Sequence, residues 1–403
     1  MKRLSEIALN VQASTTLQVD ALFKQMKQSG VDVVGFGTGE PDFDTPENIR
    51  EAAIEAIESG KTRYTPASGI PELREAVANR LRADCNADYA PEQIVIASGA
   101  KHSIYVALCC VLNAGDEVIL PAPYWVTYAE AISMVGGVPI IISGAEESDF
   151  KITKEQLQSA VSDKTKMLIL NNPSNPTGMV YDKAELKELC DVCVERDLYI
   201  LSDEVYYRFV YDDREFTSIA TLGENIKERT ILVNGVSKTY AMTGWRIGYT
   251  ASSKKLASIM GNFLSHSTSA PSTMSQFAAV EALNGSQESV DEMCRKFEER
   301  RDYIVGRIAS IPYVSCRTPQ GAFYIMLNVE KLIGKSLDGK IIENSDDFSL
   351  LFLEKGLVAT ISCRGFGCEN FVRLTYAASM ESIKTGMDRL EKFVSDVVSD
   401  RQF

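Results

Sequence analysis

The segment RTILVNGVSK, at residues 229–238, is a short apolar run that ends beside a serine and a lysine. LYILSDEV at residues 198–205 and KMLILNNP at residues 166–173 have the same form, with polar residues at the end of the apolar run. Short apolar runs separated by amphipathic, helix-length segments are typical of parallel strands that are buried on both faces. We therefore predict an α/β protein with a mostly parallel central sheet. Three further runs continue the pattern, at residues 93–97, 117–123 and 136–143.

Towards the C-terminus the character of the chain changes. Long amphipathic patterns predict helices over residues 289–311 and 380–398, and between them GAFYIMLNV and FVRLTYA predict isolated strands. A chain of 403 residues is also too long for one ordinary core. We predict a large domain over residues 46–290 and a smaller α+β domain formed by residues 1–45 and 291–403 together.

The composition limits the partners of the chain. The formal net charge is −13, and hydrophobic and charged residues make up 45% and 24% of the sequence. This charge argues against nucleic acid as a main partner, because phosphate binding needs a clustered basic surface. No run approaches the ~20 apolar residues of a membrane span. No long apolar run follows the basic N-terminal residues, as it would in a signal peptide. We expect a cytoplasmic protein without nucleic-acid or membrane partners.

Nine cysteines are scattered without a disulfide framework, and their odd number favours reduced thiols in a cytosol. Cys190 and Cys193 form a C-x-x-C pair inside AELKELCDVCVERD, which is an amphipathic helical pattern. Positions i and i+3 share one face of a helix, so we interpret the pair as core residues. The chain holds two histidines, His102 and His266, and we predict no metal site.

Ligands of open α/β sheets bind beyond the carboxyl ends of the strands, so the residues that follow each run are the candidates. SGAK, at residues 98–101, opens a helix whose first N–H groups suit a phosphate, although a tight turn alone would use the same small residues. Asn175 lies in NNPSNPTG at residues 171–178, a rigid turn that needs its prolines and glycine but not this amide. A held amide there can donate a hydrogen bond to a ligand oxygen.

Charged residues follow two further runs. Asp203 could cap a helix or act as the counter-ion of a cationic ligand atom. Lys238 could lie on the surface, but a desolvated lysine titrates lower and becomes a nucleophile. Arg246 carries a guanidinium suited to bidentate phosphate binding. Together these residues describe a ligand with a phosphate, a cationic ring nitrogen, a ring oxygen and a carbonyl that seeks an amine. Pyridoxal 5′-phosphate (PLP) has all four.

Motifs spread over nearly the whole chain resemble those of the class I aminotransferases of fold type I, and among them the bacterial aspartate aminotransferase subgroup that includes thermophilic enzymes. In order, the motifs are GTGEPDFDTP, KTRYTPASGIPELREA, PYWVTY, NNPSNPTG, SDEVY, SKTYAMTGWRIGY, GAFY and VRLTYA. Their co-occurrence in this order is very specific. The resemblance implies a homodimeric PLP enzyme that moves the amino group of L-aspartate to 2-oxoglutarate, in two half-reactions.

The resemblance also implies roles for single residues. Lys238 would hold the cofactor covalently and then move the substrate proton. Asp203 would keep the ring nitrogen protonated, and Tyr206 and Asn175 would hydrogen-bond the ring hydroxyl oxygen. Trp125 would stack on the ring face. The phosphate would take backbone groups of Gly99 and Ala100, the side chains of Ser237 and Arg246, and Tyr64 from the neighbouring subunit.

Substrate recognition is implied in the same way. Arg373 would clamp the α-carboxylate, helped by Gly39 and Asn175. The second arginine that reads the distal carboxylate in better-known aspartate aminotransferases has no matching motif here. The subgroup uses a lysine at the position of Lys101, with a hydroxyl group from the N-terminal segment. The candidates for that hydroxyl group are Ser14, Thr15 and Thr16.

The chain departs from family patterns at several positions. Gln12 stands where close relatives can carry a lysine, and Tyr128 stands where other subgroups place a histidine that supports the aspartate. Near the C-terminus, TISCRGFG replaces the commoner V-V-P-G-x-x-F-G, so that Ser362 and Cys363 stand in for Pro-Gly. We therefore expect a differently shaped loop there.

Alternatives stay open at this point. An aromatic, alanine or prephenate aminotransferase, or a PLP-dependent β-lyase, would keep Lys238 and Arg373 and differ at Lys101 and the N-terminal segment. A PLP-binding regulator without catalysis would carry a DNA-binding domain ahead of the family motifs, which here begin near the N-terminus. GFGTGEP at residues 35–41 hints at a dinucleotide loop, but glutamate takes the place of the last glycine of G-x-G-x-x-G.

Overall fold

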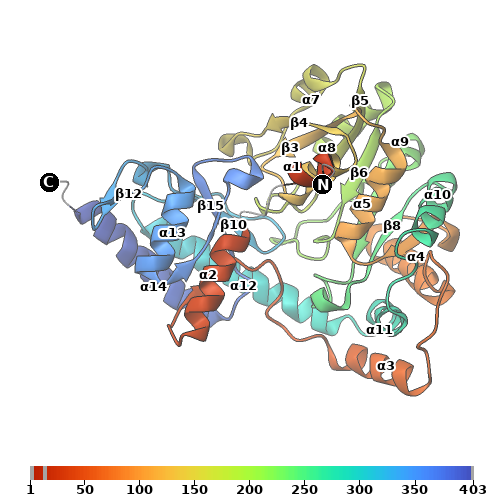
Figure 1. Cartoon of the computed structure of the whole chain (residues 1–403), viewed down its shortest axis with the longest axis horizontal. Coiled ribbons are helices and arrows are strands. Elements are labelled where there is room, and N and C mark those ends of the chain that lie inside the picture. The colour runs from red at the N-terminus through yellow and green to blue at the C-terminus, as the bar shows by residue number, and fades with distance from the viewer. Residues whose placement is uncertain (1–3, 12–15, 401–403) are drawn as a thin grey trace.

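The computed structural model describes residues 4–11 and 16–400, and its larger part is built on a seven-stranded sheet (Figure 1). The strands are β2 (Ile94–Ala97), β3 (Glu117–Ala122), β4 (Val138–Ser143), β5 (Thr165–Asn171), β6 (Tyr199–Asp203), β7 (Thr230–Gly235) and β8 (Gly248–Ala251). Their order is β2-β8-β7-β6-β5-β3-β4, and of these strands only β8 runs antiparallel to its neighbours. The predicted α/β architecture with a mostly parallel sheet is confirmed.

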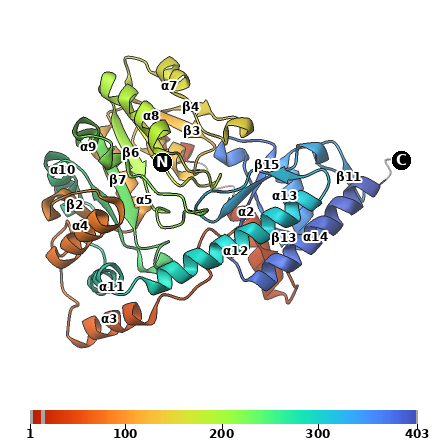
Figure 2. The same ribbon diagram turned by 180° about the vertical axis from the view of Figure 1, so that it is seen from behind.

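Alternate side chains of the central strands enter separate hydrophobic cores, because successive side chains of a strand point to opposite faces. In β5, Met167 and Ile169 join one core, whereas Leu168 and Leu170 join the other. Helices cover both faces, as a parallel sheet requires (Figure 2). One face packs against α5 (Ala100–Val111), α6 (Thr127–Met134) and α10 (Lys254–Ser265), and the other against α7 (Lys154–Ala160), α8 (Lys183–Glu195) and α9 (Glu224–Arg229). The β2–β8 end packs against α3 (Glu47–Glu58), α4 (Pro71–Cys85) and α11 (Thr273–Asn284).

The smaller part is built on an antiparallel sheet of order β14-β15-β10-β9. Its core combines Phe36, from near the N-terminus, with residues as late as Val397. The division of the chain into domains at residues 46 and 290 stays a prediction. The elements of this part are β1 (Val34–Gly35), β9 (Ser315–Cys316), β10 (Tyr324–Asn328), β11 (Ser336–Leu337), β12 (Lys340–Ile341), β13 (Val358–Ala359), β14 (Ile361–Ser362), β15 (Phe371–Thr375), α12 (Glu288–Ser310), α13 (Ser345–Gly356) and α14 (Met380–Ser399).

Two N-terminal helices pack on different parts of the molecule. Figure 1 shows α2 (Thr16–Gln28) against the smaller part, where it contacts α13, and α1 (Glu6–Asn10) against the larger part, where it contacts α6. The N-terminal segment, which we predicted to belong to the smaller domain, therefore contacts both parts. Among residues 4–11 and 16–400, no helix combines the length and the apolarity that crossing a bilayer requires.

The interpretation of Cys190 and Cys193 as core residues is confirmed. Cys190 and Cys193 are fully buried in α8, on the helix face that packs against the sheet. All nine cysteines are free thiols. The C-x-x-C spacing therefore reflects helical packing.

A cluster of aromatic rings holds the start of the smaller part together and allows a direct test of the core. Phe297 of α12 is fully buried, and its ring centroid lies 5.5 Å from that of Phe43, 5.3 Å from that of Phe209 and 5.3 Å from that of Phe323. We predict that Phe297→Ala lowers the free energy of unfolding by about 3–5 kcal/mol, because it leaves a cavity among these rings. Urea denaturation measures the change. The matched control is Leu350→Ala on the exposed face of α13, for which we expect less than about 1 kcal/mol; equal losses would contradict the packing.

Candidate active site

Three adjacent parallel strands end at one edge of the sheet, and polar residues lie at this edge. In the register of the sheet, Asn171 of β5 lies beside Asp203 of β6, and Asp203 lies beside Val233 of β7. A cleft of about 1060 Å³ opens beyond this edge. The predicted site residues that line the cleft are Gly39, Ala100, Lys101, Trp125, Asn175, Asp203, Tyr206, Ser237, Lys238, Arg246 and Arg373.

Asp203 is a buried carboxylate that forms no ion pair with any described residue. Its Oδ2 accepts a hydrogen bond of 2.6 Å from the hydroxyl group of Tyr128, and its Oδ1 accepts one of 3.2 Å from the N–H of Val205. Burial raises the pKa of Asp203 to about 6, although the hydrogen bond from Tyr128 opposes the shift. A buried carboxylate is costly without a cation. Of the two roles left open for Asp203, its position therefore favours that of a counter-ion to a cationic ligand atom over that of a helix cap.

Lys238 is a second buried charge at the same edge. Its Nζ donates a hydrogen bond of 2.5 Å to the carbonyl oxygen of Gly39. Burial lowers the pKa of Lys238 to about 8, and the positive charges of Arg373 and Arg246 act in the same direction, against Glu40. A lysine with this pKa holds a far larger neutral fraction at pH 7 than a surface lysine does. Its amine is therefore suited to nucleophilic attack on a carbonyl and to proton transfer.

The N-terminus of α5 forms an anion site together with Arg246. Gly99 precedes the helix with a φ of 89°, and a Cβ at this position would lie 2.3 Å from Nη2 of Arg246. Glycine is thus needed both for the backbone conformation and for the close approach of the guanidinium. Ser237 is buried shortly after the end of β7 and lines the same cleft. A helix N-terminus, a hydroxyl group and a guanidinium in one place suit a phosphate.

Arg373 of β15 is held on several sides. Its Nη1 donates a hydrogen bond of 3.0 Å to Oδ1 of Asn175, and its Nη2 donates one of 2.8 Å to the carbonyl oxygen of Gly37. The guanidinium lies between two rings, 4.5 Å from the centroid of Tyr324 and 5.2 Å from that of Phe366. Its Nε is buried and has no hydrogen-bond partner among the described residues. A fixed guanidinium with an unpaired N–H is suited to a ligand carboxylate.

Lys101 adds another cation to the cleft. Its Nζ lies 4.9 Å from the ring centroid of Trp125. Burial lowers the pKa of Lys101, and the charge of Arg246 acts in the same direction. The ring of Trp125 in turn meets the ring of Tyr128 edge to face, with centroids 5.4 Å apart. Trp125 is therefore fixed at the wall of the cleft between a cation and a residue that binds Asp203.

Some predicted residues are not brought to the cleft by the described part of this chain. The side chain of Tyr64 is fully exposed and does not line the cleft. Gln12, Ser14 and Thr15 lie outside the described residues, as does the side chain of Thr16. The hydroxyl group predicted to assist Lys101 therefore stays a prediction.

The unusual TISCRGFG segment forms β14 and the turn after it. Ser362 shares a hydrogen bond of 2.9 Å with the hydroxyl group of Ser345, and Cys363 is fully buried. The turn brings Phe366 onto the guanidinium of Arg373. The serine and cysteine that replace Pro-Gly thus anchor a loop that still reaches the carboxylate site.

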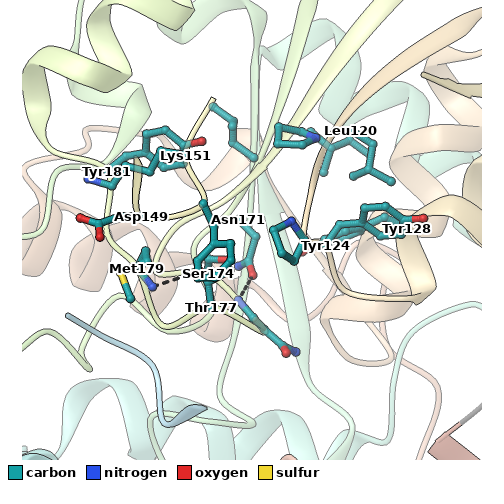
Figure 3. A pocket seen from close by; sticks show the side chains of 16 residues that line it. Leu120, Tyr124, Tyr128, Asp149, Lys151, Asn171, Ser174, Thr177, Met179 and Tyr181 are labelled. Carbon is teal, nitrogen blue, oxygen red and sulfur yellow. Dashed lines mark hydrogen bonds between the residues drawn. The ribbon is translucent and has the colours of Figure 1, made fainter. Parts of the chain in front are cut away.

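A smaller cavity of about 30 Å³ lies behind the cleft, between β3, β5 and the loop after β5 (Figure 3). Asn171 links the two: its Oδ1 accepts a hydrogen bond of 2.7 Å from the N–H of Asn175, and its Nδ2 donates one of 3.0 Å to the carbonyl oxygen of Asp203. The backbone of Asn175 is therefore held in place relative to Asp203 by Asn171, at the end of β5. A cavity of this volume can hold at most a few water molecules. The larger cleft is therefore the candidate for ligand binding.

Sequence reasoning gave no role to two residues that the fold brings into the site. Tyr324 and Phe366 both line the cleft and enclose the guanidinium of Arg373. GAFY was one of the motifs behind the family resemblance, but no spacing rule connects its tyrosine to Arg373 or to Tyr206. The contact depends on how β10 and β15 pair.

The fold and the geometry of the site agree with the class that the motifs indicated. Residues 31–390 match the family described as aminotransferase class I and II. The chain belongs to this family, and the resemblance stated from the motifs is confirmed.

Individual relatives cover nearly the whole chain. The aspartate aminotransferase of Bacillus sp. (strain YM-2) is 44% identical over 381 residues, which are 94% of this chain and 96% of the relative. The probable aspartate/prephenate aminotransferase of Aquifex aeolicus is 42% identical and covers 98% of this chain and 100% of its own. The solved aspartate aminotransferase from Rhizobium meliloti superposes with a TM-score of 0.95 at 37% identity, over 98% of this chain and 100% of that one. The fold type I assignment is confirmed.

The cofactor of the family is PLP, and the residues present fit it. The carboxylate of Asp203, which forms no ion pair with a described residue, suits a protonated ring nitrogen. The space that Gly99 leaves beside Arg246 suits a phosphate. Lys238, with its lowered pKa, is an amine that can be linked to an aldehyde. The chain is a PLP-dependent aminotransferase.

The unpaired charge of Asp203 should make the cofactor-free protein less stable as pH rises. Its pKa is raised from 3.8 to about 6 in the folded state. Between these values the folded protein binds more protons than the unfolded chain, so stability falls as pH increases. We predict that Asp203→Asn stabilises the cofactor-free protein at pH 8 by on the order of 1–3 kcal/mol, with a smaller gain at pH 5. The same variant should bind PLP more weakly.

Thermal unfolding of the cofactor-free protein at the two pH values measures the effect. Asp191→Asn, at an exposed ion pair with Lys187, serves as the control and should change the unfolding temperature little. A gain in Asp203→Asn that is as large at pH 5 as at pH 8 would contradict the assignment of the cost to the buried charge.

Proposed function

We propose that the protein transfers the amino group of L-aspartate to 2-oxoglutarate, with oxaloacetate and L-glutamate as products, in two successive half-reactions. The observation that carries the proposal is the pair of cations in the cleft. Arg373 has a buried Nε without a hydrogen-bond partner among the described residues. Lys101 lines the same cleft, its pKa is lowered by burial, and its Nζ lies over the ring of Trp125. Both substrates carry two carboxylates, and two fixed cations match them.

Each residue of the site then has a task. When bound, PLP supplies a carbonyl group for the substrate amine and a protonated ring that withdraws electrons from the substrate Cα. Lys238 would hold the cofactor and, once released, would move a proton between the substrate Cα and C4′ of the cofactor. Asp203 keeps the proton on the ring nitrogen. Tyr206 and Asn175 donate hydrogen bonds to the ring oxygen, and Trp125 supports the ring face. The phosphate is held by Gly99, Ala100, Ser237 and Arg246.

We further propose a homodimer in the cytoplasm. Tyr64 supports the dimer, because its large side chain is fully exposed in a single chain and would reach the phosphate bound by the neighbouring subunit. A partner would bury it. Nine free thiols support a reducing compartment.

A second substrate class has some support. Val19 and Phe23 of α2 and Ile361 of β14 line the cleft beside its polar residues. The relative from Aquifex aeolicus is named for aspartate and prephenate. A bulkier apolar side chain could therefore enter as well, and the first experiment separates the two cases.

The first experiment is a spectral titration of the PLP-loaded protein with single amino acids, without any keto acid. We expect L-aspartate and L-glutamate at low concentration to convert the absorbance of the lysine-bound cofactor into that of its aminated form. L-alanine and L-phenylalanine should need concentrations at least about tenfold higher, because a missing charge contact costs about 1.5–3 kcal/mol.

Lys238→Ala is the control variant for the same titration. It should bind PLP without the lysine-bound absorbance and lose transamination almost completely. Rates like those of the wild type in this variant would contradict the aminotransferase mechanism. Conversion by phenylalanine but not by aspartate would leave the reaction class intact and contradict the dicarboxylate substrates.

The role of Lys101 is tested by a variant that keeps the aliphatic stem. We predict that Lys101→Met lowers kcat/KM for aspartate by about 10–100-fold and that for alanine by much less, because only aspartate has a distal carboxylate. Steady-state kinetics with both donors measures the difference. Lys61→Met is the matched control, since Lys61 also lies over an aromatic ring, at 5.3 Å from Phe277, but outside the cleft. Equal losses with both donors would mean that Lys101 does not read the distal carboxylate.

A further inference from the structure

Tyr324 touches several parts of the site at once, although the proposed chemistry gives it no task. It begins β10 and is fully buried. Its hydroxyl oxygen lies 2.9 Å from the hydroxyl oxygen of Tyr206, and the guanidinium of Arg373 lies 4.5 Å from its ring centroid. A Cβ on Gly39 would lie 2.6 Å from the same hydroxyl oxygen. Tyr324 therefore packs against the backbone that binds Lys238, beside both a cofactor residue and a substrate residue.

The pairing of two strands builds this arrangement. Met326 of β10 lies opposite Arg373 of β15. Tyr324 lies two residues before Met326, which is one full period of a strand. Residues two apart share one face of a strand, and diagonal neighbours across an antiparallel pair lie within reach of long side chains. The ring of Tyr324 thus lies against Arg373, while its hydroxyl group extends to Tyr206. Tyr206 belongs to the segment after β6 of the large sheet.

The two tyrosine hydroxyl groups share a single hydrogen bond, and its direction matters. A hydroxyl group has one proton to donate. If Tyr206 donated to Tyr324, that proton could not bind a ligand oxygen in the cleft. If Tyr324 donates to Tyr206, the proton of Tyr206 is free to point into the cleft, which Tyr206 lines.

The surrounding charges favour Tyr324 as the donor. Burial raises the pKa of both phenols, but the guanidinium of Arg373 opposes this shift at Tyr324. At Tyr206 burial raises the pKa well above its usual value. Arg373 opposes this shift at Tyr206 too, but there the carboxylate of Asp203 adds to it. The more acidic hydroxyl group is the better donor, and a cation over its ring stabilises the electron density that donation leaves behind.

We propose that Tyr324 is a positioning residue, whose hydroxyl group donates to the oxygen of Tyr206 and so turns the proton of Tyr206 towards the ring oxygen of the cofactor. The proposal rests on the proposed function, because it needs PLP in the cleft. Donation into Tyr206 also strengthens the hydrogen bond that Tyr206 itself donates, since chains of hydrogen bonds polarise one another. Through Arg373, the same side chain links the carboxylate site to the cofactor site.

The test is a pH titration of the absorbance of the PLP-loaded protein without substrate. Its midpoint reports the proton on the nitrogen that joins Lys238 to the cofactor. Tyr324→Phe keeps the ring over Arg373 and removes only the hydroxyl group. We expect the midpoint to rise by about 0.3–1 pH unit. The reason is that a ring oxygen with a weaker hydrogen bond from Tyr206 keeps more negative charge and holds that proton more firmly.

Two further variants separate this effect from general loss of packing. Tyr211→Phe removes another buried hydroxyl group, which donates to the carbonyl oxygen of Ala322 next to the same strand; the midpoint should not move. In a Tyr206→Phe background, adding Tyr324→Phe should give no further rise, because Tyr324 acts only through Tyr206.

Each outcome decides the proposal. An unchanged midpoint in Tyr324→Phe would make the hydroxyl group purely structural, and a fall would mean that Tyr206 donates to Tyr324; either result overturns the relay. An equal rise in the Tyr206→Phe background would overturn it as well. A wild-type protein without the lysine-bound absorbance would contradict the proposed function and the relay together, whereas a normal wild-type spectrum with an unshifted variant overturns the relay alone.

Discussion

A carboxylate buried at the end of a central strand, which forms no ion pair with any described residue, is the constraint on which the rest of the site depends. Two hydrogen bonds, from Tyr128 and from the N–H of Val205, offset part of the cost of burying Asp203, but they do not replace a counter-charge. The surrounding sheet makes this cost tolerable. β6 lies between β5 and β7, and Ile200 and Leu201, on its two faces, are fully buried. A stable parallel sheet thereby supports a site in which a buried charge costs free energy until a cationic ligand is bound.

The other charges of the cleft complement this carboxylate. Lys238, Arg246 and Arg373 line the same cleft, and the positive charges of the two arginines help to lower the pKa of Lys238. Cations that repel one another in a buried place are stabilised by an anionic ligand, just as Asp203 is stabilised by a cationic one. The charges of the protein are therefore complementary to those of its ligands. The cations suit a phosphate and a carboxylate, and the carboxylate of Asp203 suits a protonated ring nitrogen.

The local patterns of the sequence were enough for much of the fold and for part of the site. Helix α4 begins at Pro71, where a missing N–H costs nothing, and it ends before Asn86, which adopts a left-handed conformation. Asp203 and Lys238 could be singled out because each follows a short buried run and parallel strands end at one edge. Their individual roles, by contrast, came from the family resemblance. What the sequence did not reveal is contact between distant elements: Tyr206 and Tyr324 are 118 residues apart, and hydrophobic periodicity carries no information about which strands pair or in which register.

The pairing of β10 with β15 has a consequence for how substrate and cofactor recognition are connected. Arg373 and Tyr324 come from neighbouring strands of the small sheet, whereas Tyr206 and Asn175 come from the edge of the large sheet. Arg373 reaches across to Asn175, and Tyr324 reaches across to Tyr206. Both bonds join the same two sheets, so a displacement of one strand pair changes both at once. The residues that bind the carboxylate and those near the ring oxygen are therefore connected through one strand pair, β10 and β15.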